Sequence, residues 1–169
     1  LVGLNKLWNL NLSNQQLEKI GLKLGADVPF CINGGAVLAL GIGEELTPIK
    51  GLTKDVCILV CKPDLFVSTK EVYECIDSKD IDKRPNNKFL IECLKNEDTR
   101  QLAENMFNVL EGVTMDKHPV IQQIKDIMTN NRALGAMMSG SGPTVFGLYE
   151  NREDAVKCKA ILELSLIHI

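Results

Sequence analysis

A short glycine-rich turn near the end of the chain limits how the second half of the sequence can fold. The stretch S-G-S-G-P over residues 139–143 separates two short apolar segments, Leu134–Met138 and Thr144–Tyr149, and this arrangement predicts a pair of antiparallel strands. An earlier apolar run, Val56–Pro63, is of the continuous kind that is buried in a sheet. Because helical patterns separate these strands, we predict an α+β fold with helices on one face of a mostly antiparallel sheet.

Capping residues and apolar spacing predict the helices of this second half. Ser68 with Glu71 has the spacing of a capping box, and Asn151 is placed to cap the last helix. The charged stretch Asp77–Asn87 contains a proline and is predicted as a loop. The remaining helices are predicted over Lys88–Lys95, Thr99–Leu110 and Pro119–Asn130.

Two helical patterns open the chain. Ser13 with Gln16 is a second capping box, and the helix that it starts is predicted to end at Gly25. The pattern before it places four apolar residues on one helical face: Leu1, Leu4, Leu7 and Trp8.

A predicted hairpin completes the first half. Pro29 disfavours a helical conformation at Val28, so we expect the chain to leave the second helix extended. Ala36–Leu40 and Glu45–Ile49 are then predicted as strands on either side of a glycine-containing turn. The polar connector Gly51–Asp55 is the expected domain boundary.

The composition excludes several functional classes. The chain has 169 residues, of which 45% are hydrophobic, and a formal net charge of −3, which is typical of a soluble globular protein. A single tryptophan and mild acidity argue against nucleic acid as a partner. No apolar run approaches the roughly 18 residues of a membrane helix. The six cysteines form no C-x-x-C pair, and with only two histidines they are expected to be small buried residues in a reducing compartment rather than a zinc site.

Asp27 is the first candidate functional residue. It lies in the stretch L-G-A-D-V-P-F-C, where Gly25 and Ala26 leave room for a substrate and Pro29 stiffens the chain. Its carboxylate would be ionised near neutral pH and could accept a proton from a substrate hydroxyl or orient that hydroxyl. The residues alone leave a second interpretation open, in which the Asp27 oxygen caps its own turn.

Gly140, Ser141 and Gly142 form the second candidate site. The two glycines allow positive φ, and successive N–H groups in such a turn can bind an anion. The alternative is a plain turn between two strands. The pattern is not a dinucleotide-binding fingerprint or a nucleophile elbow, because a strand follows where those motifs need a helix. Glu44 and Glu45 could bind a metal, but we expect them to be solvated at a bulged turn.

In combination, three stretches resemble the GHMP small-molecule kinases, the family that includes galactokinase, homoserine kinase and mevalonate kinase. They are L-G-A-D-V-P-F-C-I-N-G-G-A-V-L-A-L-G-I-G-E-E-L, P-D-L-F-V-S-T-K-E-V-Y-E-C-I-D and A-L-G-A-M-M-S-G-S-G-P-T-V-F-G-L-Y, and the resemblance runs from Leu1 to about Leu162. It implies the GHMP kinase fold in three parts. Residues 1–54 would be the C-terminal part of an N-terminal domain like the second domain of ribosomal protein S5. Residues 55–163 would be a ferredoxin-like C-terminal domain, and residues 164–169 an appended tail.

The resemblance also implies a reaction and its participants. The γ-phosphoryl group of ATP, bound with Mg²⁺, would pass to the 2-hydroxyl of a cytidine-diphosphate-linked methylerythritol, in the non-mevalonate route to isoprenoid precursors. Asp27 matches the family's catalytic aspartate, and Gly140, Ser141 and Gly142 match its third motif, a glycine turn beside the nucleotide phosphates. The implied protein is a cytoplasmic enzyme with no nucleic-acid or membrane partner and no protein metal site.

The chain departs from the family at both ends. The family's Gly/Ser-rich phosphate loop and its lysine-bearing strand have no counterpart here, so we expect a C-terminal fragment that is inactive by itself. The final stretch L-S-L-I-H-I, residues 164–169, matches the translation of a sequencing-library adapter and is left out of the fold prediction. Two alternatives stay open: another GHMP kinase, or a non-catalytic ferredoxin-like interaction module.

Overall fold

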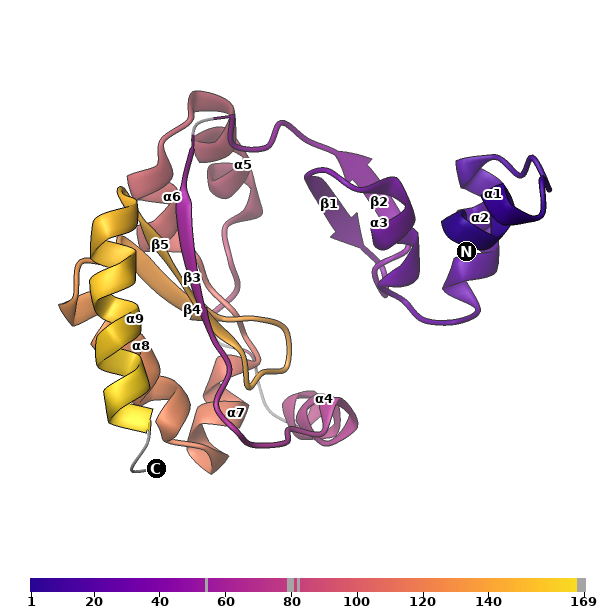
Figure 1. Cartoon of the computed structure of the whole chain (residues 1–169). Helices are drawn as coiled ribbons and strands as arrows, with labels where there is room; N and C mark the ends of the chain where they lie inside the picture. The colour runs from indigo at the N-terminus through magenta and orange to yellow at the C-terminus, as the bar shows by residue number, and fades with distance from the viewer. Residues whose placement is uncertain (54, 79–80, 82, 167–169) are drawn as a thin grey trace. The chain divides into compact units, whose positions relative to one another are not determined.

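The computed structural model describes residues 1–53, 55–78, 81 and 83–166. The chain divides into two compact units, Leu1–Gly51 and Leu52–Ile169, and each is described by itself (Figure 1). This division lies close to the boundary that we predict after residue 54. The assignment of the two units to kinase domains remains a prediction.

The first unit contains three short helices and a hairpin. The Ser13 hydroxyl accepts a hydrogen bond from the Gln16 N–H, and the Gln16 side chain accepts one from the Ser13 N–H, which confirms this capping box. The two strands of the hairpin pair antiparallel, with Val37 opposite Pro48 and Leu40 opposite Glu45. The elements are α1 (Val2–Leu7), α2 (Asn14–Leu22), α3 (Val28–Asn33), β1 (Val37–Leu40) and β2 (Glu45–Pro48).

The prediction that the chain is extended at Val28 is wrong. A helix, α3, begins at this residue, and Pro29 lies in its first turn. Proline is tolerated there because the N–H groups of a first turn have no partner within the helix. Helices α2 and α3 pack closely, since a side chain at Gly21 would lie 2.7 Å from Val28 Cγ1. Asp27 therefore lies between two helices rather than between a helix and a strand.

The second unit is built on an antiparallel sheet with strand order β3-β5-β4. Its strands are β3 (Cys57–Cys61), β4 (Gly135–Met138) and β5 (Val145–Tyr149), so the predicted strand pair around the glycine turn is confirmed. Val145 on the central strand pairs with Met138 on one side and Cys61 on the other. The expectation that the whole run at β3 is buried is wrong. Burial alternates along β3, so Ile58 and Val60, which lie on the face turned away from the core, are 59% and 60% exposed.

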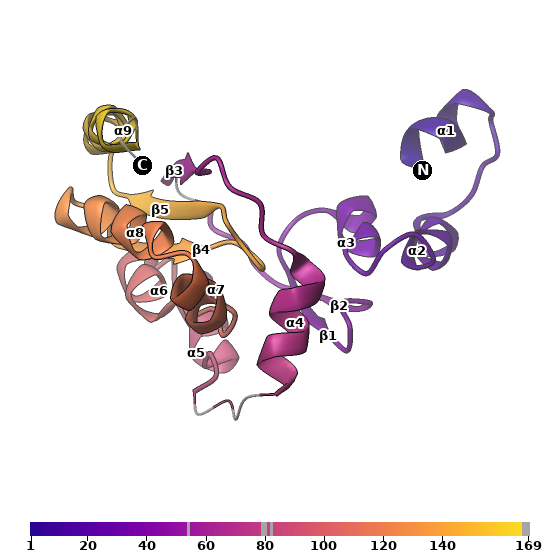
Figure 2. The same ribbon diagram turned by 90° about the horizontal axis from the view of Figure 1, so that it is seen from below.

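Helices cover this sheet unevenly. On one face of β5, Gly147 lies close to Met128 of α8, and Tyr149 lies beside Cys158 of α9. Figure 2 shows the sheet with these helices around it. On the other face, Gly135 of β4 lies directly against the backbone carbonyl of Ala103 in α6, so the helices are not confined to one face as predicted. The helices are α4 (Thr69–Asp77), α5 (Asn87–Asn96), α6 (Thr99–Asn105), α7 (Glu111–Lys117), α8 (Val120–Asn130) and α9 (Arg152–Leu166).

Several helix boundaries differ from the sequence prediction, and α2 ends at Leu22 rather than at Gly25. Helix α6 ends at Asn105 instead of Leu110, because Met106 has an extended backbone with φ −58° and ψ 136°. Helix α7 was not predicted, yet it contributes the buried residues Val113 and Thr114. The last helix includes residues 164–166, which belong to the tail that the prediction left out. Residues 167–169, and residues 79, 80 and 82 of the predicted loop, lie outside the described part of the chain.

The core of the second unit joins the sheet to α4, α7, α8 and α9. It includes Ile121, Ile124, Met128, Met138, Val145, Tyr149 and Cys158, all of which are fully buried. All six cysteines are free thiols, but only Cys93 and Cys158 are buried and Cys31 is exposed, so the expectation of buried cysteines holds only in part. Burial raises the pKa of the Tyr149 phenol and of the Cys158 thiol. Within the described residues, no helix combines the length and apolarity that a membrane span requires.

We predict that Gly135→Ala lowers the free energy of unfolding by about 1–3 kcal/mol, because the new methyl group would overlap the Ala103 carbonyl and force α6 away from β4. Urea denaturation followed by circular dichroism measures this effect.

Gly112→Ala is the matched control. Gly112 lies in α7, is exposed and has no neighbouring atom within 4 Å of an added methyl group. This substitution should raise the free energy of unfolding by about 0.5–1 kcal/mol through helix propensity. Equal effects of the two substitutions would contradict the close approach of α6 to β4.

Candidate functional site: a glycine turn held by α7

The turn between β4 and β5 has a backbone that needs glycine at two positions. Gly140 has φ +57° and Gly142 has φ +90°, both in the range that side chains disfavour. A side chain at Gly142 would also lie 2.6 Å from Met138 Sδ. Two backbone hydrogen bonds close the turn: the Ser139 N–H donates to Thr144 O at 2.8 Å and the Gly142 N–H donates to Ser139 O at 3.0 Å. The predicted residues 140–142 thus lie together in one tight turn.

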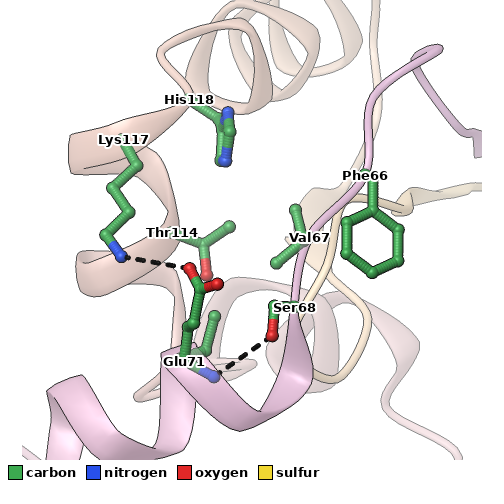
Figure 3. Close-up of a pocket in the computed structure, with 8 residues that line it drawn as sticks. Phe66, Val67, Ser68, Glu71, Thr114, Lys117 and His118 are labelled. Atoms are coloured by element: carbon green, nitrogen blue, oxygen red, sulfur yellow. Dashed lines mark hydrogen bonds and ion pairs between the residues drawn. The ribbon is translucent and has the colours of Figure 1, made fainter.

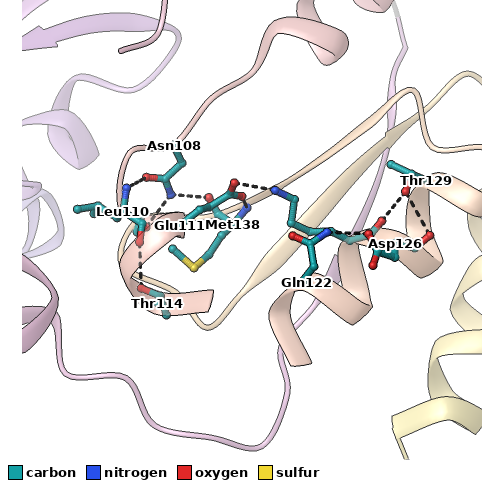
Figure 4. A network of polar contacts seen from close by, with 10 residues as sticks. Asn108, Leu110, Glu111, Thr114, Gln122, Asp126, Thr129 and Met138 are labelled. Atoms are coloured by element: carbon teal, nitrogen blue, oxygen red, sulfur yellow. Dashed lines mark hydrogen bonds and ion pairs between the residues drawn. The ribbon is translucent and has the colours of Figure 1, made fainter. Parts of the chain in front are cut away.

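Side chains from α7 and the residues just before it hold this turn from one side (Figure 4). Asn108 Nδ2 donates to Met138 O and to Gly140 O, each at 2.8 Å. Asn108 Oδ1 accepts a hydrogen bond from the Leu110 N–H at 3.0 Å. The buried Thr114 hydroxyl contacts Ser141 O at 3.1 Å and its own helix at Leu110 O at 3.2 Å. Three carbonyl groups of the turn and of the strand end are therefore fixed by side chains.

A buried ion pair supports the same region. The Glu111 carboxylate accepts a hydrogen bond from the Met138 N–H at 2.6 Å and lies 2.6 Å from Lys125 Nζ. The two side chains are only 10% and 18% exposed. Removing one partner of such a pair leaves a buried charge uncompensated and typically costs about 3–5 kcal/mol. The pair ties the end of β4 to α7 and α8.

The turn also meets the start of α4. Ser141 Oγ and Thr69 Oγ1 lie 2.9 Å apart, and both residues carry exposed hydroxyl groups. Ser68 caps α4 by accepting a hydrogen bond from the Glu71 N–H, which confirms half of the predicted capping box, whereas the Glu71 carboxylate lies near Lys117. Among the described residues, the N–H groups of Gly140 and Ser141 have no hydrogen-bond acceptor. These donors and the paired hydroxyls suit an anionic ligand such as a phosphate group.

A cavity of about 280 Å³ lies between α4 and α7 (Figure 3). Thr114 lines it and also holds the turn. Lys117 Nζ lies 3.9 Å from the Glu71 carboxylate, so the cation beside the cavity is already paired. The lining residues are Phe66, Val67, Ser68, Glu71, Val72, Thr114, Lys117 and His118.

Asp27 lies in the other unit. It precedes α3 with a helical backbone conformation, φ −82° and ψ −11°, and its side chain makes no capping hydrogen bond. The interpretation in which its oxygen caps the turn is therefore not what the structure shows. The residue is exposed, and Gly43 of the hairpin turn approaches the neighbouring Ala26 so closely that an added side chain would lie 3.4 Å from its carbonyl oxygen.

Neither glutamate of the hairpin forms a metal site in the described structure. The Glu44 carboxylate accepts a hydrogen bond from the Ile42 N–H at 2.7 Å and so stabilises its own turn, and Glu45 is exposed at the start of β2. Across residues 1–53, 55–78, 81 and 83–166, no group of three or more His, Cys, Asp or Glu side chains could hold a metal ion.

The sequence prediction missed the residues that support the turn. Asn108 and Glu111 have the spacing of an N-cap and its third helical residue, which could have identified the start of α7. We instead extended the preceding helix to Leu110. The contacts of Asn108 with residues 138 and 140 join positions about 30 residues apart, and no local pattern predicts them.

Parts of this chain are similar to known proteins. Residues 90–166 match the protein family described as GHMP kinases C terminal. The chain is 65% identical over 156 residues to a 4-diphosphocytidyl-2-C-methyl-D-erythritol kinase from Clostridioides difficile, covering 92% of this chain and 53% of that protein. It is 47% identical over 169 residues to the protein of the same name from Caldicellulosiruptor saccharolyticus, covering 100% of this chain and 58% of that protein. The chain thus spans about half the length of the curated relatives that it matches.

Solved structures show the same relationship. A crystal structure of 4-(cytidine 5'-diphospho)-2C-methyl-D-erythritol kinase is similar to this chain, with a TM-score of 0.78 and 28% identity. The similarity covers 96% of this chain and 57% of the chain in that crystal structure. Homoserine kinase from Cytophaga hutchinsonii matches 95% of this chain with a TM-score of 0.71, and at 21% identity it shows the fold alone. Residues 90–166 are therefore similar to the C-terminal domain of the GHMP kinases, and the whole chain is similar to about half the length of such kinases.

Proposed function

We propose that this chain is part of an ATP-dependent kinase that phosphorylates the 2-hydroxyl of 4-diphosphocytidyl-2-C-methyl-D-erythritol, in the non-mevalonate route to isoprenoid precursors. The observation that carries the proposal is the 65% identity to a curated kinase of that name over 92% of the chain. This identity favours the proposed substrate over those of other GHMP kinases. It also favours an enzyme over a non-catalytic interaction module.

The glycine turn is proposed to act on the phosphates of ATP. Transfer of a phosphoryl group needs positioning and stabilisation of charge more than covalent chemistry. The N–H groups of Gly140 and Ser141 and the hydroxyls of Ser141 and Thr69 are donors that fit phosphate oxygens. Mg²⁺ would arrive with ATP, whose phosphates are its usual ligands in kinase sites.

Asp27 is proposed to act on the substrate alcohol. Its carboxylate is exposed and makes no capping hydrogen bond, so it is available to a ligand. In the proposed reaction the substrate oxygen forms a bond to the γ-phosphorus as the bond from that phosphorus to the ADP oxygen breaks. The hydroxyl proton passes to Asp27 or is oriented by it. Cytoplasmic location belongs to the same proposal, and the six free thiols agree with a reducing compartment.

We predict that Asp27→Asn in the complete protein lowers kcat by about 10²–10⁴-fold, because the amide cannot accept the proton. The KM for ATP should stay within about twofold, because this residue is not proposed to bind the phosphates. A coupled assay of ADP release measures both constants. Glu45→Gln, a neutralised carboxylate exposed in the same unit, is the control and should leave both unchanged. An unchanged kcat for Asp27→Asn would remove Asp27 from the mechanism.

We also predict that Gly142→Ala in the complete protein lowers kcat/KM for ATP by about 10²-fold. The added methyl group would meet Met138 Sδ at 2.6 Å in a backbone with φ +90°, so the turn must shift. Gly34→Ala is the control, because Gly34 has φ +71° but open space around it. It should cost about 1–2 kcal/mol of stability and leave the KM for ATP within about twofold. If both variants keep wild-type constants for ATP, the turn does not bind the phosphates.

A further inference from the structure

We propose that Asn108 is a positioning residue that holds the Ser141 N–H toward a phosphate group of the phosphoryl donor. The inference rests on the proposed function, because it assumes that the glycine turn binds a phosphate. It assigns a role to a side chain that lies outside the turn and 33 positions before Ser141 in the sequence.

The carboxamide of Asn108 matches the groups around it. Its Nδ2 has two protons and donates to the carbonyl oxygens of Met138 and Gly140, while its Oδ1 accepts the Leu110 N–H. Asn108 therefore bridges the end of β4 and the middle of the turn, and it is itself fixed to the start of α7. A carboxylate or a hydroxyl in its place could still accept the Leu110 N–H but could not donate to both carbonyls.

Because the peptide group is planar, the hydrogen bond that fixes Gly140 O also fixes the direction of the Ser141 N–H. In a trans peptide the C=O and the following N–H point in opposite directions. Because Gly140 O points at Asn108, the Ser141 N–H points away from Asn108. The next peptide is held in the same way, since Ser141 O accepts a hydrogen bond from the Thr114 hydroxyl.

The other N–H groups of the turn have partners. The Ser139 N–H donates to Thr144 O, and the Gly142 N–H donates to Ser139 O. In the described structure this leaves Gly140 and Ser141 as the residues whose N–H groups are available to a ligand. Of these two donors, the one at Ser141 has its peptide plane fixed directly by Asn108.

Glycine at positions 140 and 142 makes this anchoring necessary. Two glycines in a short turn leave the backbone many conformations, so unsupported N–H groups would have to be ordered each time a phosphate binds. Donors that are already oriented avoid that reorganisation. Such preorganisation is the main source of electrostatic stabilisation in enzyme sites. The Asn108 carboxamide supplies this support.

A merely structural role predicts different behaviour. If Asn108 only stabilises the turn that leads into α7, substitutions that keep an acceptor for the Leu110 N–H should be tolerated. Both Asn108→Asp and Asn108→Ser keep an acceptor, but the carboxylate has no donor and the serine hydroxyl has a single proton, so neither can hold both carbonyls. The serine variant adds no charge, so it separates loss of positioning from repulsion between a new carboxylate and the phosphates.

The test measures kcat, the KM for ATP and the KM for the cytidine-diphosphate-linked alcohol in the complete protein. The controls are Asn86→Ser and Asn86→Asp, because Asn86 caps α5 in the same unit by accepting the Phe89 N–H at 3.2 Å. Thermal unfolding of each variant corrects the rate constants for the folded fraction. We expect both Asn108 variants to lower kcat/KM for ATP at least about tenfold, with the KM for the alcohol within about twofold. Both Asn86 variants should match the wild type.

Two outcomes overturn the inference, and they differ from each other. If the wild type is active and Asn108→Ser has the same kcat and the same KM for ATP as Asn86→Ser, Asn108 has only a structural role and the proposed function stands. If the wild type transfers no phosphoryl group to the alcohol, the proposed function fails and the role of Asn108 fails with it.

Discussion

The anchoring of the β4 end and the glycine turn by α7 is the constraint on which the rest of the site depends. Glu111 binds the Met138 N–H at the end of β4, and its buried charge is balanced by Lys125 of α8. Asn108 and Thr114 then hold the carbonyl groups that follow. A turn with two glycines would otherwise be among the least ordered parts of the fold. Polar contacts from α7 and from Asn108, just before it, make the turn a defined array of donors instead.

The ordered turn also links the candidate site to the core. Met138 and Val145, the residues on either side of the turn, are fully buried and pair across the two strands. The sheet that carries them is covered by α8 and α9, whose buried residues fill one face. Stability of the core and geometry of the donors are therefore connected, because a shift of β4 moves Met138 O and the Glu111 contact together.

Local signals predicted much of this fold, and long-range contacts account for most of what they missed. The capping box at Ser13 and the strand pair around residues 139–143 depend on neighbours in the sequence, and both were predicted. Helix α3 was missed because Pro29 was treated as a helix breaker, although it lies in a first turn. The exposure of Ile58 and Val60 depends on which face of β3 the rest of the unit covers, which composition does not reveal. The turn at residues 140–142 was predicted as a candidate site, whereas its supports at Asn108 and Thr114 are visible only once α7 is placed beside it.

The central proposal is that this chain is part of a kinase that phosphorylates one hydroxyl of one substrate. The direct measurement is ³¹P nuclear magnetic resonance of the reaction of the complete protein with ATP, Mg²⁺ and 4-diphosphocytidyl-2-C-methyl-D-erythritol. The account predicts loss of the γ-phosphate resonance of ATP and a new phosphate monoester resonance, coupled to the carbon that bears the 2-hydroxyl. A phosphate monoester on a different alcohol, or free phosphate with no organic product, would contradict it.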